Sequence, residues 1–127
     1  MLSMFSPKTQ HRIGWLLTAL PALMLTASAA MKFVQPAGFA DGLGHLGWPI
    51  ELALALGLLE LTCTAIYLFP RTSVLGAILL TGYLGGAIAT HLRVGDPYYT
   101  QVLLGVMVWG GLYFRNPRLR ALIPLID

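Results

Sequence analysis

The sequence predicts an all-α integral membrane protein, an antiparallel bundle of four transmembrane helices, from its composition and its pattern of apolar runs. The 127 residues are 57% hydrophobic and 10% charged, whereas a soluble domain carries about 25% charged residues. Apolar runs cover residues 13–31, 50–69, 72–92 and 99–114. A helix needs about 20 apolar residues, with a range of about 17 to 25, to cross the hydrocarbon core. We therefore treat residues 1–127 as one transmembrane domain.

The first run has a second interpretation. Lys8 and Arg12 precede an apolar stretch that contains Ala27-Ser28-Ala29, and this order resembles a secretory signal with a small-residue cleavage site. The apolar stretch is longer than the roughly 7–15 residues of a signal's hydrophobic region. The length therefore favours a transmembrane helix over residues 13–31.

Three breaks separate the runs. The Pro70-Arg71 turn is so short that the helices on either side are expected to be antiparallel neighbours, and Gly95-Asp96-Pro97 separates the third and fourth runs. The longer segment 33–49 contains four glycines but is largely apolar. We expect it to lie at the membrane interface or to re-enter the mouth of the bundle. The fourth run is short, so its boundary is the least defined by the sequence.

The basic residues predict the orientation. Four crossings place six Lys and Arg residues on the side of the termini and two, Lys32 and Arg93, on the other side; the six are Lys8, Arg12, Arg71, Arg115, Arg118 and Arg120. Cytoplasmic segments carry the excess of positive charge. Both termini are therefore expected in the cytoplasm, with the protein in the cell membrane and lipid as its solvent.

Composition and spacing argue against several other functions. The net charge is +3, but the basic residues flank apolar runs and do not form the basic patch or stripe of a nucleic-acid-binding surface. The single cysteine, Cys63, excludes a disulfide within the chain. His11, His45 and His91 lie in three separate segments, so we expect no metal or haem site formed by this chain alone.

Glu60 is the sharpest candidate for function. It lies eleven residues before Arg71, or roughly 16 Å along a helix, which places it near the middle of the membrane. Ionisable groups at such depth are costly, face the interior of a bundle and mark functional sites. Glu51 lies at the end of the same run and about half a turn out of phase, so the two glutamates are not expected to form a pair.

Helix direction brings further polar residues toward Glu60. Side chains lean toward the N-terminus of their own helix, so Lys32, Glu60 and His91 are expected to converge in the outer half of the bundle. Tyr83 lies near the depth of Glu60, with Gln101 somewhat above it. We take Glu60 and His91 as candidate catalytic residues. The candidate ligand-binding residues are Lys32, Tyr83, Gln101 and Arg93.

Each of these residues also has a structural interpretation. Lys32 can extend its ammonium group to the lipid headgroups. His91, Arg93 and Asp96 can form an ordinary interfacial cluster, and Glu60 can make a structural hydrogen bond between helices as the neutral acid. Ala77, Thr81, Gly85 and Ala89 recur every fourth residue, and small residues at this spacing allow close helix contacts. We expect that stripe to pack within the bundle, with a homo-oligomer contact as the alternative.

The sequence resembles the DoxX-like family of small four-span membrane proteins over nearly its whole length. The resemblance rests on several short motifs in order: Met31-Lys32-Phe33, Leu46-Gly47-Trp48-Pro49, Leu59-Glu60-Leu61, Gly85-Gly86-Ala87, His91 and Gly95-Asp96. Some members of this family are subunits of membrane redox systems, or associate with proteins that handle oxidative and thiol stress. With one cysteine, this chain is not expected to perform thiol-relay chemistry by itself.

The resemblance implies a subunit or scaffold of a membrane redox or stress-related complex, with a polar pocket for a lipophilic ligand such as a quinone. In this interpretation Lys32 and His91 donate to the head group, and Glu60 accepts or carries a proton. The alternative is a small membrane enzyme that uses Glu60 or His91 as a general acid–base on a lipophilic substrate. A transporter component is less favoured, because no inverted repeat is visible in the four runs. The sequence leaves open whether the chain is itself an enzyme.

Overall fold

The structure, a computed structural model, describes residues 4–126, and every regular element in that range is helical. The elements are α1 (Pro7–Val34), α2 (Phe39–His45), α3 (Ala53–Leu68), α4 (Ser73–Arg93), α5 (Tyr99–Arg115) and α6 (Pro117–Arg120), with 3₁₀ turns η2 (Ile50–Leu52) and η3 (Pro70–Thr72). The expectation of an all-α protein is therefore confirmed.

Local sequence explains where the first helix begins and ends. The Ser6 side chain accepts a hydrogen bond from the Thr9 backbone N–H at 3.1 Å, and Pro7 occupies the first helical position; both are favoured at a helix start. The helix ends at Gln35, whose φ of 51° is left-handed. α1 is therefore longer at both ends than the predicted span 13–31.

Three helical segments of the described chain are long and apolar enough to cross a membrane. They are Pro7–Val34, Ile50–Leu68 and Pro70–Arg93, and they contain the first three predicted spans almost completely. The fourth predicted span, 99–114, corresponds to α5, which has 17 residues and lies at the lower end of the spanning range. The fourth crossing stays a prediction.

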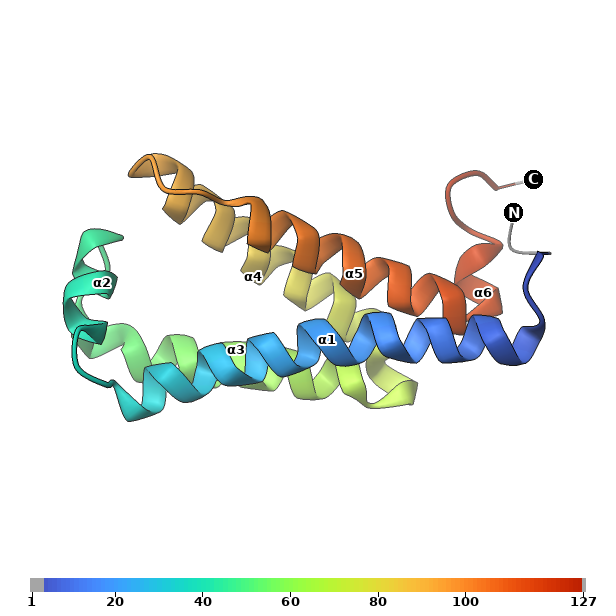
Figure 1. Ribbon diagram of the computed structural model, residues 1–127, viewed down its shortest axis with the longest axis horizontal. Helices are drawn as coiled ribbons and strands as arrows, with labels where there is room; N and C mark the ends of the chain where they lie inside the picture. The colour runs from blue at the N-terminus through green and yellow to red at the C-terminus, as the bar shows by residue number, and fades with distance from the viewer. Residues whose placement is uncertain (1–3, 127) are drawn as a thin grey trace.

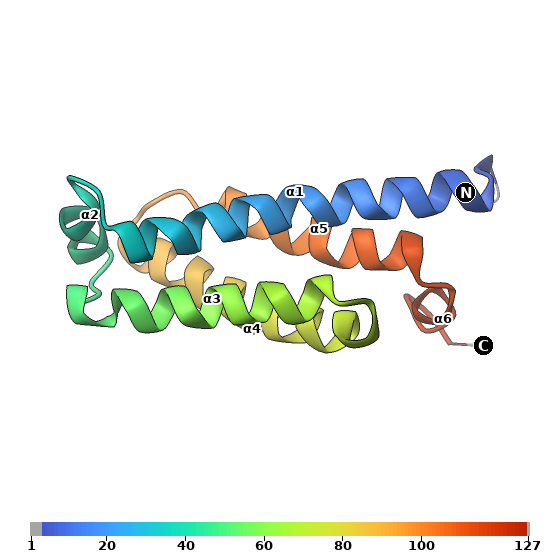
Figure 2. The ribbon, with the colours of Figure 1, turned by 90° about the horizontal axis from the view of Figure 1, so that it is seen from below.

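The long helices run side by side but do not stay equally close. α1 contacts α3 and α5, and α4 contacts the same two helices. Figures 1 and 2 show that the two termini lie at one end of the molecule and that α2 lies at the other. Toward the α2 end, the α4–α5 pair diverges from the α1–α3 pair (Figure 1). We refer to these as the termini end and the α2 end.

Small residues allow the closest contacts near the termini end. A Cβ added to Gly76 on α4 would lie 2.2 Å from the Tyr67 backbone on α3, and one added to Gly111 on α5 would lie 2.6 Å from the Thr18 hydroxyl on α1. The η3 turn therefore joins α3 and α4 as the tight hairpin that Pro70-Arg71 predicted. These contacts hold α3 against α4, and α1 against α5, in the half of the molecule nearer the termini.

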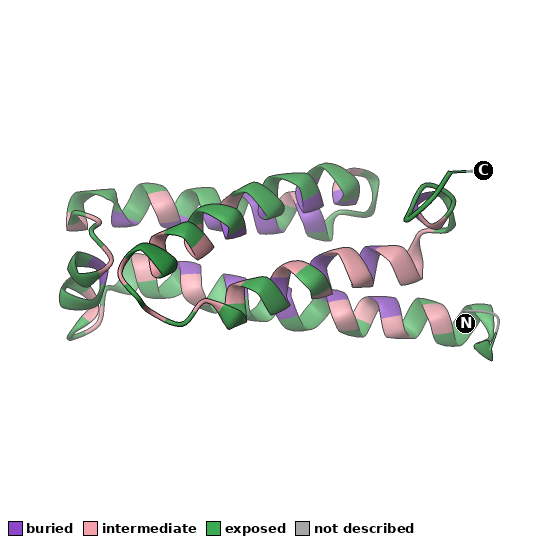
Figure 3. Cartoon of the chain, turned by 90° about the horizontal axis from the view of Figure 1, so that it is seen from above, coloured by how far each residue is buried: buried purple, intermediate pink, exposed green. Residues whose placement is uncertain are grey.

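The predicted packing of the small-residue stripe on α4 within the bundle holds only for the half of the stripe nearer the termini end. Ala77 is buried, but Thr81, Gly85 and Ala89 are exposed. Trp109 Nε1 of α5 still donates to the Thr81 hydroxyl at 2.7 Å, whereas a Cβ added to Gly85 would meet nothing within 4 Å. Figure 3 shows that buried residues follow the inward faces of the helices, while the outward faces are exposed.

A polar cluster ties the helices together at the termini end. The Arg115 side chain on α5 donates through Nε to the Thr18 hydroxyl on α1 at 3.0 Å, and through Nη1 to the Ser73 hydroxyl on α4 at 3.3 Å. Its guanidinium carbon also lies 4.4 Å from the centre of the Trp15 ring. Tyr67 on α3 donates to the Val108 carbonyl on α5 at 2.7 Å. The helices are therefore held together at the termini end and diverge toward the α2 end.

Candidate functional site

A pocket of about 770 Å³ fills the space between the diverging helix pairs at the α2 end. Residues of α1, α3, α4 and α5 form its walls, and residues 39–48, in and after α2, lie at its mouth. Apolar side chains such as Leu25, Leu56 and Leu104 make up most of its surface. A few polar groups on an apolar lining are typical of a small-molecule site.

The Lys32–Glu60 ion pair forms the polar centre of one wall. Lys32 Nζ on α1 donates to Glu60 Oε1 on α3 at 2.9 Å, and the side chains are 14% and 2% exposed. Lys32 also donates to the Ser28 hydroxyl at 2.8 Å, one helical turn earlier. The structure therefore brings together two of the three groups that were expected to converge, and most of this pair is shielded from solvent.

A close approach of α1 and α3 positions this pair. A Cβ on Gly57 would lie 3.1 Å from the Lys32 Cβ and 3.3 Å from the Phe33 ring. Gly57 precedes Glu60 by three residues, so the two share a helix face. The absence of a side chain at residue 57 lets the helices approach until the carboxylate reaches the ammonium group.

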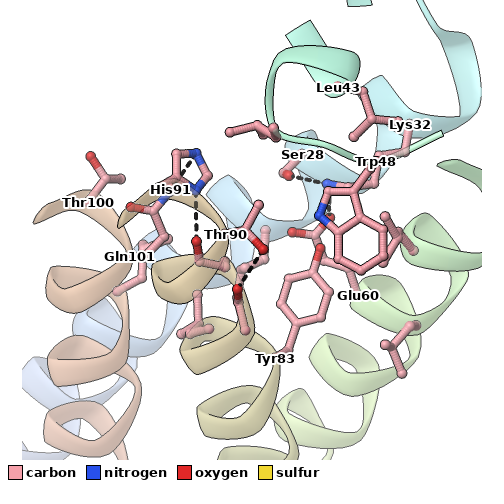
Figure 4. A pocket seen from close by; sticks show the side chains of 18 of the residues that line it. Ser28, Lys32, Leu43, Trp48, Glu60, Tyr83, Thr90, His91, Thr100 and Gln101 are labelled. Atoms are coloured by element: carbon pink, nitrogen blue, oxygen red, sulfur yellow. Dashed lines mark hydrogen bonds and ion pairs between the residues drawn. The ribbon is translucent and has the colours of Figure 1, made fainter. Parts of the chain in front are cut away.

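The Tyr83 side chain extends from α4 into the pocket. Figure 4 shows its hydroxyl pointing toward the Glu60 carboxylate, from the side opposite Lys32. Tyr83 was predicted at this depth, and the structure places it there. The carboxylate therefore has polar neighbours from both α1 and α4.

His91 lies on another wall of the pocket, away from the Lys32–Glu60 pair (Figure 4). Its Nδ1 lies 2.8 Å from the Ala87 carbonyl, and its Nε2 lies 3.5 Å from the Gln101 amide nitrogen. A carbonyl can only accept, so Nδ1 carries the proton and, in the neutral ring, Nε2 accepts from Gln101. His91 and Gln101 thus form a second polar group across the cavity, and the expected convergence of His91 with Glu60 does not occur.

The Gln101 side chain leaves one group unsatisfied. Its amide oxygen is buried and has no hydrogen-bond partner within residues 4–126. An unpaired buried acceptor costs about 1–3 kcal/mol. Because Gln101 lines the pocket, a water or a donor group of a bound molecule would satisfy this oxygen.

The remaining predicted residue, Arg93, does not line the pocket. Its guanidinium donates to the Leu46 carbonyl, between α2 and η2. His45 and Asp96 do line the pocket, and His45 Nε2 lies 3.1 Å from Asp96 Oδ1 across its mouth. Arg93 therefore helps to hold the segment that covers the pocket, and its predicted contact with a ligand gains no support from its position.

Sequence reasoning missed four pocket residues that matter in the structure: Ser28, Trp48, Gly82 and Gly86. Ser28 lies four residues before Lys32, a spacing that could have revealed their contact. The position of Trp48 depends on the fold of segment 33–49, which apolar periodicity does not define. The two glycines gave no separate signal because α4 contains several small residues.

The sequence model of the DoxX-like family matches residues 16–112. The chain belongs to the DoxX-like family. No curated protein and no solved structure shows a significant match to it.

The family match spans every residue that lines the pocket of this DoxX-like protein, from Met24 to Leu104. The pocket is therefore built within the part of the chain that the family shares. In the described range, no group of three or more His, Cys, Asp or Glu side chains is placed to hold a metal ion.

Proposed function

We propose that this DoxX-like protein crosses the cell membrane four times, with α5 as the fourth crossing and both termini in the cytoplasm. The termini end carries six of the eight basic residues, which supports this orientation. Large apolar side chains point outward from the helices, including Leu16 (71% exposed), Leu58 (57%) and Leu75 (52%). Lipid covers them. The pocket then lies in the outer half of the bundle, with residues 39–48 at the outer interface.

The proposed function is the binding of a lipophilic molecule with a neutral polar head group. The single observation that carries it is the buried Lys32–Glu60 pair on the wall of a large apolar pocket. An ammonium group has three donors, and within residues 4–126 two are used, by Ser28 and Glu60. The third is free to donate to a ligand oxygen. Because Glu60 already neutralises Lys32, a carbonyl or hydroxyl suits the site better than an anion.

A quinone is the ligand that we propose first. Its ring carries acceptor oxygens on opposite edges, and the pocket offers a donor on each of two walls: the third N–H of Lys32, and the second N–H of the Gln101 amide, whose first N–H donates to His91. A role as a subunit or scaffold of a redox or stress-related complex rests on the family resemblance alone. The acid–base alternative gains less from the geometry, because both nitrogens of His91 have partners.

Retention of lipophilic molecules during purification tests this function. Wild-type protein is solubilised from quinone-containing membranes, and bound molecules are extracted and quantified by mass spectrometry per mole of protein. We expect a quinone with the wild type and at least a tenfold loss with Glu60→Gln, which leaves the Lys32 charge without its counter-ion. Tyr83→Phe is expected to give a smaller loss.

Glu51→Gln is the matched control, since Glu51 is exposed and does not line the pocket. It removes the only other glutamate of the chain and should retain as much quinone as the wild type. The proposal fails if folded Glu60→Gln and wild-type protein retain equal amounts, or if the wild type retains only bulk phospholipid.

A further inference from the structure

The glycines of α4 fall into two groups that differ in their surroundings. Gly76 is buried against α3, where an added Cβ would lie 2.2 Å from the backbone of Tyr67. Gly82 and Gly86 are exposed, and a Cβ at either position would meet nothing within 4 Å. Helix packing therefore explains Gly76 but neither of these two, nor Gly85, which is exposed with equally empty surroundings.

Gly82 and Gly86 line the pocket, whereas Gly85 does not. They lie four residues apart, about one helical turn, on the same face of α4. Glycine destabilises the interior of a helix relative to alanine, so two such residues without a packing role need another explanation. What they provide is free space along one wall of the cavity.

α3, which neighbours α4, contributes apolar side chains to the same pocket. Leu56 and Leu59 of α3 line the same pocket, and Leu59 is 51% exposed. The two helices are in contact near Gly76 and diverge toward the α2 end (Figure 1). Both belong to segments long and apolar enough to cross a membrane, so in a bilayer an opening between them would face hydrocarbon. The side of the pocket nearer α5 instead carries the polar side chains of Thr100 and Gln101.

We propose that the opening between α3 and α4 is a subsite for the hydrocarbon tail of the ligand, which passes over Gly82 and Gly86 into the bilayer. The inference rests on the proposed function, since it places the tail of a molecule whose head group occupies the pocket. The route begins beside Tyr83 and Glu60, which belong to the same two helices, and continues along apolar side chains such as Leu59 into hydrocarbon. Side chains at residues 82 and 86 would occupy the same volume.

Two probes distinguish the contribution of the tail to binding from that of the head group. One is a benzoquinone with a decyl tail, and the other is the same benzoquinone ring without a tail. Dissociation constants are measured in lipid nanodiscs for wild-type, Gly82→Leu and Gly86→Leu protein. We expect each substitution to weaken binding of the tailed probe at least tenfold and to change binding of the tailless ring less than twofold.

Gly85→Leu is the matched control, because it adds the same side chain to the same helix outside the pocket. It should leave the binding of both probes unchanged. If either leucine variant fails to fold, Gly82→Ala and Gly86→Ala, which suit a helix better than glycine, replace them and should give a smaller loss in the same direction.

Each remaining result decides the question. Unchanged binding of the tailed probe by the folded pocket-side variants overturns the inference. Equal weakening of both probes also overturns it, because the glycines would then border the head group. In both cases the proposed function survives. Wild-type protein that binds neither probe removes the proposed function, and the tail subsite with it.

Discussion

The Lys32–Glu60 pair places two opposite charges on the wall of the pocket, largely shielded from solvent. Glu60 is 2% exposed, and its oxygen lies 2.9 Å from the Lys32 ammonium group. Removing two charges from water costs several kcal/mol per ion, and only good geometry with further hydrogen bonds recovers this cost. Ser28 supplies one such hydrogen bond at 2.8 Å. A pair of this kind is weak support for stability but strong support for a specific polar environment.

Breaking the pair should destabilise the protein. Lys32→Met leaves a buried carboxylate without its partner, so we expect the free energy of unfolding to fall by about 3 kcal/mol. The double variant Lys32→Met/Glu60→Leu removes both charges and should recover at least half of this loss. Denaturant titration in detergent micelles measures both values.

Lys8→Met provides the control, because Lys8 is the only other lysine of the chain and is exposed. Its unfolding free energy should match that of the wild type. A Lys32→Met variant that is as stable as the wild type would show that the two side chains do not form a buried pair. Neither Lys32→Met nor the double variant should retain quinone, which separates the binding role from stability.

At the residue scale, the sequence predicted the depth of each polar side chain but not its lateral position. Depth follows from residue count and from the lean of side chains along a helix, and so Lys32, Glu60 and Tyr83 were placed correctly relative to one another. Which wall a residue occupies depends on the rotation and tilt of whole helices. That is why His91 pairs with Gln101 and not with Glu60.

Individual helices follow from the sequence more closely than their contacts do. The apolar runs, and the prolines and glycines that separate them, predicted the bounds of α3, α4 and α5 to within a few residues. α1 extends beyond its apolar run because the Ser6 cap and Pro7 favour an earlier start. The short helix α2 was not predicted, since seven residues containing two glycines carry no clear helical signal.

The α3–α4 hairpin shows what a sequence motif leaves undetermined. Small residues recur along α4 from Gly76 to Ala89, yet a Cβ added to Gly76 would clash with α3, whereas one added to Gly82, Gly85 or Gly86 would meet nothing within 4 Å. The tight η3 turn and the Arg115 contacts to Ser73 and Thr18 hold the termini end together. Beyond them the helices tilt apart. The same small-residue pattern therefore accompanies close helix packing at one end of α4 and unoccupied space at the other.

The whole molecule is a set of helices held at one end and spread at the other, and its topology can be tested directly. With Cys63 replaced by alanine, single cysteines are introduced at Ser6, Asp41, Arg71, Gly95 and Leu125. A membrane-impermeant thiol reagent then probes sealed vesicles of known orientation. We expect residues 6, 71 and 125 to react from the cytoplasmic side and residues 41 and 95 from the outer side.

Residue 125 decides the fourth crossing. α5 has 17 residues, so it spans the hydrocarbon only if it stands nearly upright. Labelling of Leu125→Cys from the same side as Gly95→Cys would show that α5 does not cross. Labelling of Ser6→Cys from the outer side would reverse the proposed orientation and place the pocket in the inner half.

The central claim is that a lipophilic ligand occupies the pocket at the α2 end, and site-specific photolabelling tests it most directly. A benzoquinone carrying a photoreactive azide is added to the wild-type protein in bilayers, and the modified residues are located by peptide mass spectrometry. We predict labels within residues 24–32 of α1 and residues 82–91 of α4, both suppressed by excess unlabelled quinone. Labels confined to outward-facing residues such as Leu16 and Leu75, without competition by unlabelled quinone, would contradict the account.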